Sequence, residues 1–217
     1  MRRRILLAKR LLAPPMSNKS IEFFDAQFQR QILAQDYKLN PFETRALEYL
    51  DGTVLDLGCG LGNLTLEAAR RGHQVLAVDS SPAAVARIEA VARCEDLPIR
   101  TLVADLACWE IEGSYSTIVA IGLLMFFPRE RAIELLRGVQ EHVKPGGRAI
   151  INVLVEGTTF MEMFQPGGYY LFRRSELQEL FSGWSILSSL HEAFPAPAGT
   201  RKEFSTVIAE KPRVGSI

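Results

Sequence analysis

The strongest constraint on the fold is an alternation of short apolar segments with longer amphipathic ones between residues 53 and 155. The short segments are typical of strands because apolar residues fill nearly every position. The longer ones carry apolar side chains three or four positions apart, as helices do. Strands that are apolar on both faces and joined by helices form parallel sheets covered on both sides. The expected strands are residues 53–57, 74–79, 99–103, 116–121 and 149–155.

The segments around these strands complete a doubly wound α/β pattern. Asn40 before Pro41 and Ser81 before Pro82 are favourable N-caps, so a helix is expected after each. The last part of the chain differs, with two strands joined by a segment rich in Pro, Ala and Gly, which predicts a hairpin-like ending. The other expected helices are residues 21–33, 63–71, 129–143 and 175–181, and the two late strands are 184–190 and 204–209.

Length and charge limit the kind of protein this can be. A chain of 217 residues is the size of one generous domain. Five basic residues and no acid fall in residues 1–15, so the remainder carries 20 basic and 25 acidic residues, a net charge of −5. We expect 1–15 to be an unstructured basic extension and 16–217 a single domain. An acidic body argues against nucleic acid as a partner.

Cysteine usage and hydropathy point to a cytoplasmic protein. The three cysteines, Cys59, Cys94 and Cys108, form no C-x-x-C pair and no zinc-type grouping with histidine. They are expected to be reduced thiols, with no metal site. The longest apolar stretch, residues 118–127, has ten residues, too few to span a bilayer. We therefore expect no membrane association.

A glycine-rich loop follows the first strand directly. Residues 56–62 read D-x-G-x-G-x-G, with glycine at Gly58, Gly60 and Gly62 and a helix expected from Asn63. Glycine lets the backbone turn tightly and approach a ligand closely. The loop lacks the third glycine of the dinucleotide G-x-G-x-x-G pattern and the Gly-Lys-Ser/Thr of a phosphate-binding P-loop. A nicotinamide oxidoreductase is therefore disfavoured.

Acidic residues end the next two strands. Asp79 lies 17 residues after Gly62 at the end of the second strand, and Asp105 follows the third. A carboxylate at the end of the second strand can accept both hydroxyls of a ribose, although Asp79 could instead cap the following helix. The carboxyl ends of parallel strands share one edge of the sheet, where open α/β sheets bind ligands. The loop and both acids are thus expected at one site.

These residues resemble the class I S-adenosylmethionine-dependent methyltransferases. Residues 54–62 are similar to the first motif of that family, Val78-Asp79 to the second and Ala104-Asp105-Leu106 to the third, with Lys144-Pro145-Gly146-Gly147 before the fifth strand. The resemblance covers about residues 36–212 and implies a Rossmann-like, mostly parallel seven-stranded sheet with helices on both faces and an antiparallel last strand. It implies S-adenosyl-L-methionine as cofactor.

The same resemblance assigns roles to residues of the site. It implies that Gly58, Gly60 and Gly62 flank the methionine part, that Asp79 holds the ribose, and that Asp105 with Leu106 borders the adenine. Further cofactor-binding residues are expected beside these motifs, namely Tyr37, Asp56, Ser80 and Ile121.

A narrower resemblance is to the tellurite-resistance (TehB-like) methyltransferases. It rests on residues 121–127, 181–184 and 201–209, and on Tyr37-Lys38-Leu39 before the first strand. Those enzymes are associated with methylation of tellurium and selenium oxyanions. The sequence departs from their pattern after His191, where Glu192 stands in place of a basic residue.

Candidates for the chemistry lie in the last third of the chain. His191 is expected to end a strand at the active-site edge, where it could act as a base or bind an anion, or be only a strand-end histidine. Arg201, with Lys202, could pair with an anionic substrate, or face solvent. Residues 158–172 hold two methionines and five aromatics that could cap an apolar pocket or be ordinary core.

The expected function is methyl transfer from S-adenosylmethionine to a small acceptor, such as a thiol or a chalcogen oxyanion like tellurite or selenite. The alternative is a non-catalytic S-adenosylmethionine-binding sensor or partner subunit, because intact binding motifs do not establish turnover. We expect residues 16–50 to form a helical lid, 51–155 the cofactor-binding core, and 156–217 a substrate cap with the C-terminal strands. A monomer or homodimer is expected.

Overall fold

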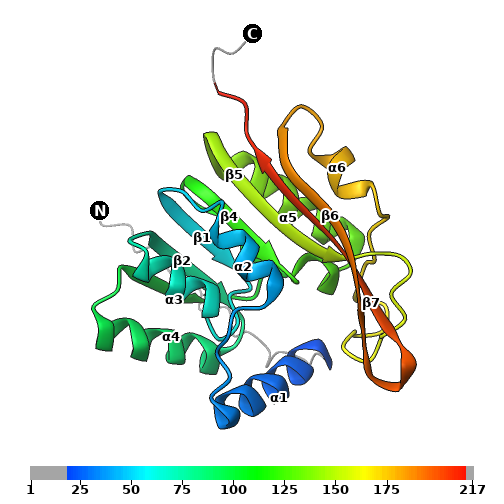
Figure 1. Ribbon diagram of the computed structural model, residues 1–217, viewed down its shortest axis with the longest axis horizontal. Coiled ribbons are helices and arrows are strands. Elements are labelled where there is room, and N and C mark those ends of the chain that lie inside the picture. Colours follow the sequence, from blue (N-terminus) through cyan, green and yellow to red (C-terminus); the bar gives the residue numbers. More distant parts are fainter. Residues whose placement is uncertain (1–18, 214–217) are drawn as a thin grey trace, which may run out of the picture.

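One mixed sheet of seven strands organises the molecule (Figure 1). The computed structural model describes residues 19–213, so the basic extension predicted at 1–15 lies outside the described residues. The strand order is β3-β2-β1-β4-β5-β7-β6. The strands are β1 (Thr53–Leu57), β2 (Gln74–Asp79), β3 (Ile99–Val103), β4 (Tyr115–Ile121), β5 (Val143–Leu154), β6 (Ser185–Pro195) and β7 (Arg201–Glu210).

The direction of the strands confirms the predicted fold class. The first five strands pair in parallel, whereas β7 pairs antiparallel with β5 on one side and with β6 on the other. The chain reverses after β3, on one side of β1, and continues with β4 on the other. The carboxyl ends of β1 and β4 therefore open a crevice between them, where sheets of this kind bind ligands.

Helices cover both faces of this sheet. On one face lie α2 (Pro41–Leu47), α3 (Asn63–Arg70) and α4 (Pro82–Glu95), and on the other α5 (Arg129–His142) and α6 (Glu176–Leu180). Two 3-10 turns, η1 (Leu124–Phe126) and η2 (Pro197–Gly199), follow β4 and β6. The remaining helix, α1 (Lys19–Ala34), lies apart from both faces, across the end of the sheet (Figure 1).

Both predicted N-caps are confirmed. The side chain of Asn40 accepts hydrogen bonds from the backbone N–H groups of Phe42 and Glu43, and the Glu43 carboxylate accepts one from Asn40 N at 2.8 Å. This is a capping box, which satisfies donors that the first helical turn leaves free. Ser81 Oγ accepts from Ala84 N at 3.4 Å and starts α4.

Several predicted boundaries are wrong in the second half of the chain. β5 begins at Val143, six residues before the expected start, because residues 144–147 form an irregularity within the strand rather than a turn before it. β6 continues to Pro195, so His191 lies inside this strand and not at its end. In the first half, the helix expected over residues 21–33 exposes the apolar side chains of Ile21, Ile32 and Leu33.

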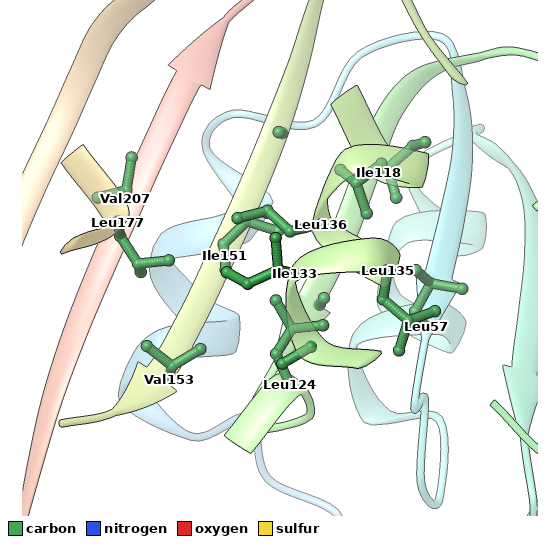
Figure 2. Packing of buried hydrophobic residues seen from close by; sticks show 14 of the residues in the cluster. Leu57, Ile118, Leu124, Ile133, Leu135, Leu136, Ile151, Val153, Leu177 and Val207 are labelled. Carbon is green, nitrogen blue, oxygen red and sulfur yellow. The ribbon is translucent and has the colours of Figure 1, made fainter. Parts of the chain in front are cut away.

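The larger core lies between the sheet and α5. Ile133 and Leu136 of α5 and Ile151 of β5 point toward one another in Figure 2, and each is almost completely buried. Burial of such side chains provides about 1.5–3 kcal/mol each, so this layer holds the strands at fixed positions. The strand ends that carry the site are thereby fixed as well.

Truncation of this core should be costly. Ile151→Ala removes a fully buried side chain and is expected to lower the free energy of unfolding by about 2–5 kcal/mol, measured by urea denaturation. Ile186→Ala on β6 is the matched control, because its side chain is 41% exposed. We expect a loss below about 1 kcal/mol there. Equal losses in the two variants would contradict this description of the core.

Candidate active site

The glycine loop joins the end of β1 to the start of α3. Gly58, Gly60 and Gly62 all have positive φ angles, of +68°, +53° and +78°. A Cβ at Gly62 would lie 2.4 Å from Ile88 of α4, so this glycine allows the loop to pack against a helix. A Cβ at Gly60 would meet the ring of Phe28 at 3.2 Å, which places α1 directly over the loop.

Asp79 connects this loop to the end of β2. One carboxylate oxygen accepts from Gly60 N at 2.8 Å and the other from Ser81 N at 2.9 Å. The side chain is 8% exposed, and burial raises its pKa against the opposing effect of these backbone hydrogen bonds. Each carboxylate oxygen has a second lone pair, so Asp79 retains the capacity to accept hydroxyl groups.

Asp56 lies beneath the loop, near the end of β1. It is 4% exposed and accepts a hydrogen bond from Thr65 Oγ1 at 2.6 Å. Burial, only partly opposed by this hydrogen bond, raises its pKa to about 7. Glu43 and Asp79 add negative charge nearby and raise the pKa further. Asp56 is therefore a carboxyl group that titrates close to neutral pH.

A cavity of about 730 Å³ opens at this edge of the sheet. This volume is in the range of pockets that enclose a whole organic ligand. Its wall brings together most of the residues predicted for the cofactor, from four different strand ends. They are Asp56, Gly58, Gly60, Asp79, Ser80, Asp105, Leu106 and Ile121.

Two predicted cofactor residues lie outside the cavity wall. Gly62 is behind the loop, against Ile88. The ring of Tyr37 lies under the guanidinium of Arg87, 3.8 Å from the ring centroid, and is not part of the wall. Contact with a cofactor remains a prediction for these two residues and for those in the wall.

The predicted catalytic pair also lies away from the wall. His191 Nε2 is 3.1 Å from Glu203 Oε2, and Arg201 Nε is 2.9 Å from Glu203 Oε1. Arg174 binds the same buried carboxylate at 2.5 Å. These groups join β6, β7 and the segment before α6, and neither His191 nor Arg201 reaches the cavity. A catalytic role for either remains a prediction.

The sequence predicts a lid over residues 16–50 but does not identify which residues of α1 line the site. Phe24 and Phe28 line the cavity, and Asp25 accepts a hydrogen bond from Ser81 Oγ at 3.0 Å. At its other end, Ser20 Oγ accepts from Gln165 N at 3.2 Å. The helix thus contacts both the cofactor motifs and the segment after β5. These contacts join α1 to segments far away in the sequence, so the sequence alone could not identify them.

The cavity has two chemically different halves. The half near β1 and β2 carries the glycine loop and most of the carboxylates. The half near β4, β5 and β7 is mainly apolar, with one amide and one lysine, and is lined by Met125, Phe126, Asn152, Leu154, Met163, Lys202 and Phe204.

No group of three or more histidine, cysteine or acidic side chains suited to a metal ion is found within residues 19–213. In the same part of the chain, no helix has the length and apolar character needed to cross a membrane.

Comparison with known proteins agrees with this geometry. Residues 54–147 match the family described as a methyltransferase domain. The chain is 28% identical over 165 residues to the probable S-adenosyl-L-methionine-dependent methyltransferase TehB of Haemophilus influenzae (strain 10810), covering 73% of this chain and 57% of that protein. It is 31% identical over 165 residues to Hemagglutinin 1 of Eikenella corrodens, covering 73% of this chain and 54% of that protein. The chain thus spans little more than half the length of these relatives.

Solved structures give the same fold. The crystal structure of TehB from Haemophilus influenzae superposes with a TM-score of 0.69 at 24% identity, over 80% of this chain and 62% of that one. A Burkholderia thailandensis 1,6-didemethyltoxoflavin-N1-methyltransferase, solved with its substrate and S-adenosylhomocysteine, superposes with a TM-score of 0.66 at 19% identity, over 96% and 98% of the two chains. Residues 54–147 belong to the methyltransferase domain family, and the chain has the fold of the class I S-adenosylmethionine-dependent methyltransferases. Within that class, its relatives include the TehB proteins.

Loss of the Asp79 carboxylate should weaken binding of S-adenosylhomocysteine. Asp79→Ala removes an acceptor for ribose hydroxyls and releases Gly60 N, and hydrogen bonds to a charged group are worth roughly 1.5–3 kcal/mol each. We expect a loss of affinity of about 100-fold, measured by calorimetric titration. Glu112→Ala, an exposed acid before β4, is the control and should leave affinity unchanged. Unchanged affinity in Asp79→Ala would remove Asp79 from the site.

The raised pKa of Asp56 predicts a pH dependence of stability. In the unfolded chain its pKa is near 3.8, and in the folded protein about 7. Between these values the folded state binds more protons, so its contribution to stability is complete below pH 4 and is lost as pH rises through 7. Asp56→Asn should flatten the fall in unfolding free energy over pH 4–7, followed by urea denaturation. An identical slope in both proteins would contradict the assignment.

Proposed function

We propose that the protein transfers a methyl group from S-adenosylmethionine to a small-molecule acceptor. The observation that carries this proposal is the cavity itself. One half combines the glycine loop with Asp79, and the other is apolar and bounded by different strands. A transferase must hold a donor and an acceptor side by side.

The residues present fit the cofactor. Asn63 Oδ1 lies at the start of α3 in the cavity wall, buried and without a hydrogen-bond partner among the described residues. It could accept from the ammonium of the methionine part. Asp79 would hold the ribose hydroxyls, and Leu106 with Asp105 would border the adenine. When bound, S-adenosylmethionine supplies a methyl group activated by its sulfonium, and S-adenosylhomocysteine remains after a lone pair of the acceptor forms the new bond.

The chain itself would mainly position and enclose the reactants. α1 covers the glycine loop through Phe28 and contacts the segment after β5 through Ser20. We propose that residues 16–50 act as a lid, 51–155 as the cofactor core and 156–217 as the acceptor cap. Exclusion of water and alignment of the reacting atoms are the main contributions an enzyme can make when the donor is already activated.

A thiol or a chalcogen oxyanion such as tellurite or selenite is the acceptor proposed first. A thiolate, or the lone pair of tellurite or selenite, attacks without a base at the site. His191, the base predicted from the sequence, is bound to Glu203 outside the cavity wall. Met125 and Met163 give the acceptor half polarizable sulfur atoms. Relatives named TehB support this choice. We further propose that the protein acts in the cytoplasm, as a monomer or homodimer, without nucleic acid.

A non-catalytic S-adenosylmethionine sensor is the second candidate. It is favoured by one observation, the absence of a histidine or cysteine other than Cys59 from the cavity wall of the described residues. Burial raises the pKa of the Cys59 thiol well above its usual value, so Cys59 is a poor nucleophile. Only turnover separates a sensor from an enzyme.

The test is a titration followed by turnover. We expect micromolar binding of S-adenosylhomocysteine by calorimetry, and production of S-adenosylhomocysteine from S-adenosylmethionine when tellurite, selenite or a small thiol is added. Asp79→Ala serves as the binding-deficient control. Binding without turnover on any acceptor would favour the sensor. No binding at all would contradict the proposed function.

A further inference from the structure

Lys202 is a cationic residue in the acceptor half of the cavity that has no carboxylate partner among the described residues. It lies near the start of β7, half-buried in the cavity wall, with its ammonium 4.7 Å from the centroid of the Phe160 ring. Within residues 19–213, no carboxylate oxygen lies within 4.0 Å of this ammonium. The neighbouring Arg201, in contrast, is paired with Glu203.

The acids of the cavity are already engaged elsewhere. Each of the five carboxylates in the wall accepts a hydrogen bond from a partner in its own part of the site. These pairs are Asp25 with Ser81 Oγ, Glu43 with Asn40 N, Asp56 with Thr65 Oγ1, Asp79 with Gly60 N and Ser81 N, and Asp105 with Ala107 N. None of them neutralises Lys202.

The apolar surroundings of Lys202 make it unfavourable for its ammonium to lack a negatively charged partner. Its head group lies against an apolar cluster that includes Phe160, Leu154 and Met163. Burial there lowers the pKa of Lys202, and no charged group is among the causes. A buried charge is usually paired, because its loss of hydration is otherwise uncompensated. A ligand that brings a negative charge to this position would supply the missing partner.

A second unsatisfied group lies deeper in the same half. Asn152 on β5 is completely buried in the cavity wall. Its Nδ2 donates to Thr206 Oγ1 at 2.9 Å, but its Oδ1 has no partner among the described residues. Leaving a buried acceptor without a donor costs about 1–3 kcal/mol. A ligand with an O–H or N–H group at this point would satisfy it.

The pairing of β5 with β7 fixes the distance between the backbone positions of Lys202 and Asn152. Thr206 of β7 lies directly opposite Asn152, and Lys202 is four residues before Thr206 on the same face of the strand. At about 3.3 Å per residue, the two backbone positions are separated by about 13 Å along β7. Phe204 lies between them and also lines the cavity. A bare oxyanion could bind at one of these groups, whereas an elongated organic molecule could bind at both.

We propose that the acceptor is an organic anion with an apolar, elongated body, whose carboxylate binds Lys202 and whose O–H or N–H group donates to Asn152. The aromatic and aliphatic wall between the two groups, including Phe204 and Leu154, would contact that body. This inference rests on the proposed methyl transfer and narrows its substrate class. Among the acceptors proposed above, it favours an organic thiol over a bare chalcogen oxyanion, because only the organic molecule can reach both groups.

The experiment compares matched charged and neutral probes on the intact protein saturated with S-adenosylhomocysteine. The probes are 4-hydroxybenzoate, 4-hydroxyphenylacetate and 4-hydroxycinnamate, each with its primary amide. We expect at least one carboxylate to bind by calorimetry at least tenfold more tightly than its amide. Lys202→Met should abolish that preference by lowering the affinity for the carboxylate probe about 10- to 100-fold, as expected for loss of one charged hydrogen bond.

Controls separate a specific effect from a damaged fold. Lys144→Met removes an exposed lysine next to Thr53 of β1 and should leave both probes unaffected. Asn152→Leu should weaken binding of the carboxylate probe and of its amide equally. It removes the amide oxygen that accepts from the hydroxyl group, which both probes carry. Each variant must retain the wild-type affinity for S-adenosylhomocysteine, which shows that the cofactor half is intact.

The outcomes distinguish this inference from the proposed function. Three results would overturn the inference and leave methyl transfer untouched. They are equal affinities for the carboxylate and its amide, no binding of any probe, and an unchanged preference for the carboxylate in Lys202→Met. Turnover of tellurite that is unaffected by Lys202→Met, without binding of any organic acid, would do the same. Failure of the wild-type protein to bind S-adenosylhomocysteine would instead overturn the proposed function, and this inference with it.

Discussion

The carboxylate of Asp79 holds the cofactor half of the cavity together. Its two oxygens accept from Gly60 N and Ser81 N, so one side chain fixes both the glycine loop after β1 and the start of α4 after β2. Backbone N–H groups that point toward a buried carboxylate are ordered by strong, charge-assisted hydrogen bonds. Ser81 in turn donates to Asp25 of α1, which extends the same network to the helix across the cavity.

The acceptor half is held together by strand pairing and apolar packing and not by one central carboxylate. Its walls come from strand ends and from segments far apart in the sequence, and they are held by packing and by the pairing of β5, β6 and β7. The buried carboxylate of Glu203, bound by Arg174, Arg201 and His191, joins these segments next to the cavity. Arg174 and Arg201 are therefore committed to structure, whereas Lys202 lines the acceptor half without a carboxylate partner among residues 19–213. Substrate selection would depend on Lys202, because Arg174 and Arg201 are already ion-paired with Glu203.

The parts of the account that the sequence could predict are those determined locally. The strand and loop of residues 53–62, the acid at Asp79 and the cap at Ser81 follow from nearest neighbours and periodicity. The position of His191 could not be predicted, because the length of β6 depends on its pairing with β7. The unpaired oxygen of Asn152 also depends on partners distant in the sequence, since Thr206 is 54 residues away. The same holds for the contact of Phe28 with the glycine loop.

The most direct test of the central claim is a crystal structure of the protein with S-adenosylhomocysteine. We expect the ribose hydroxyls on Asp79, the ammonium beside Asn63 Oδ1, and the sulfur directed toward the apolar half bounded by Asn152 and Phe204. A cofactor bound with its sulfur directed away from that half, or bound outside this cavity, would contradict it.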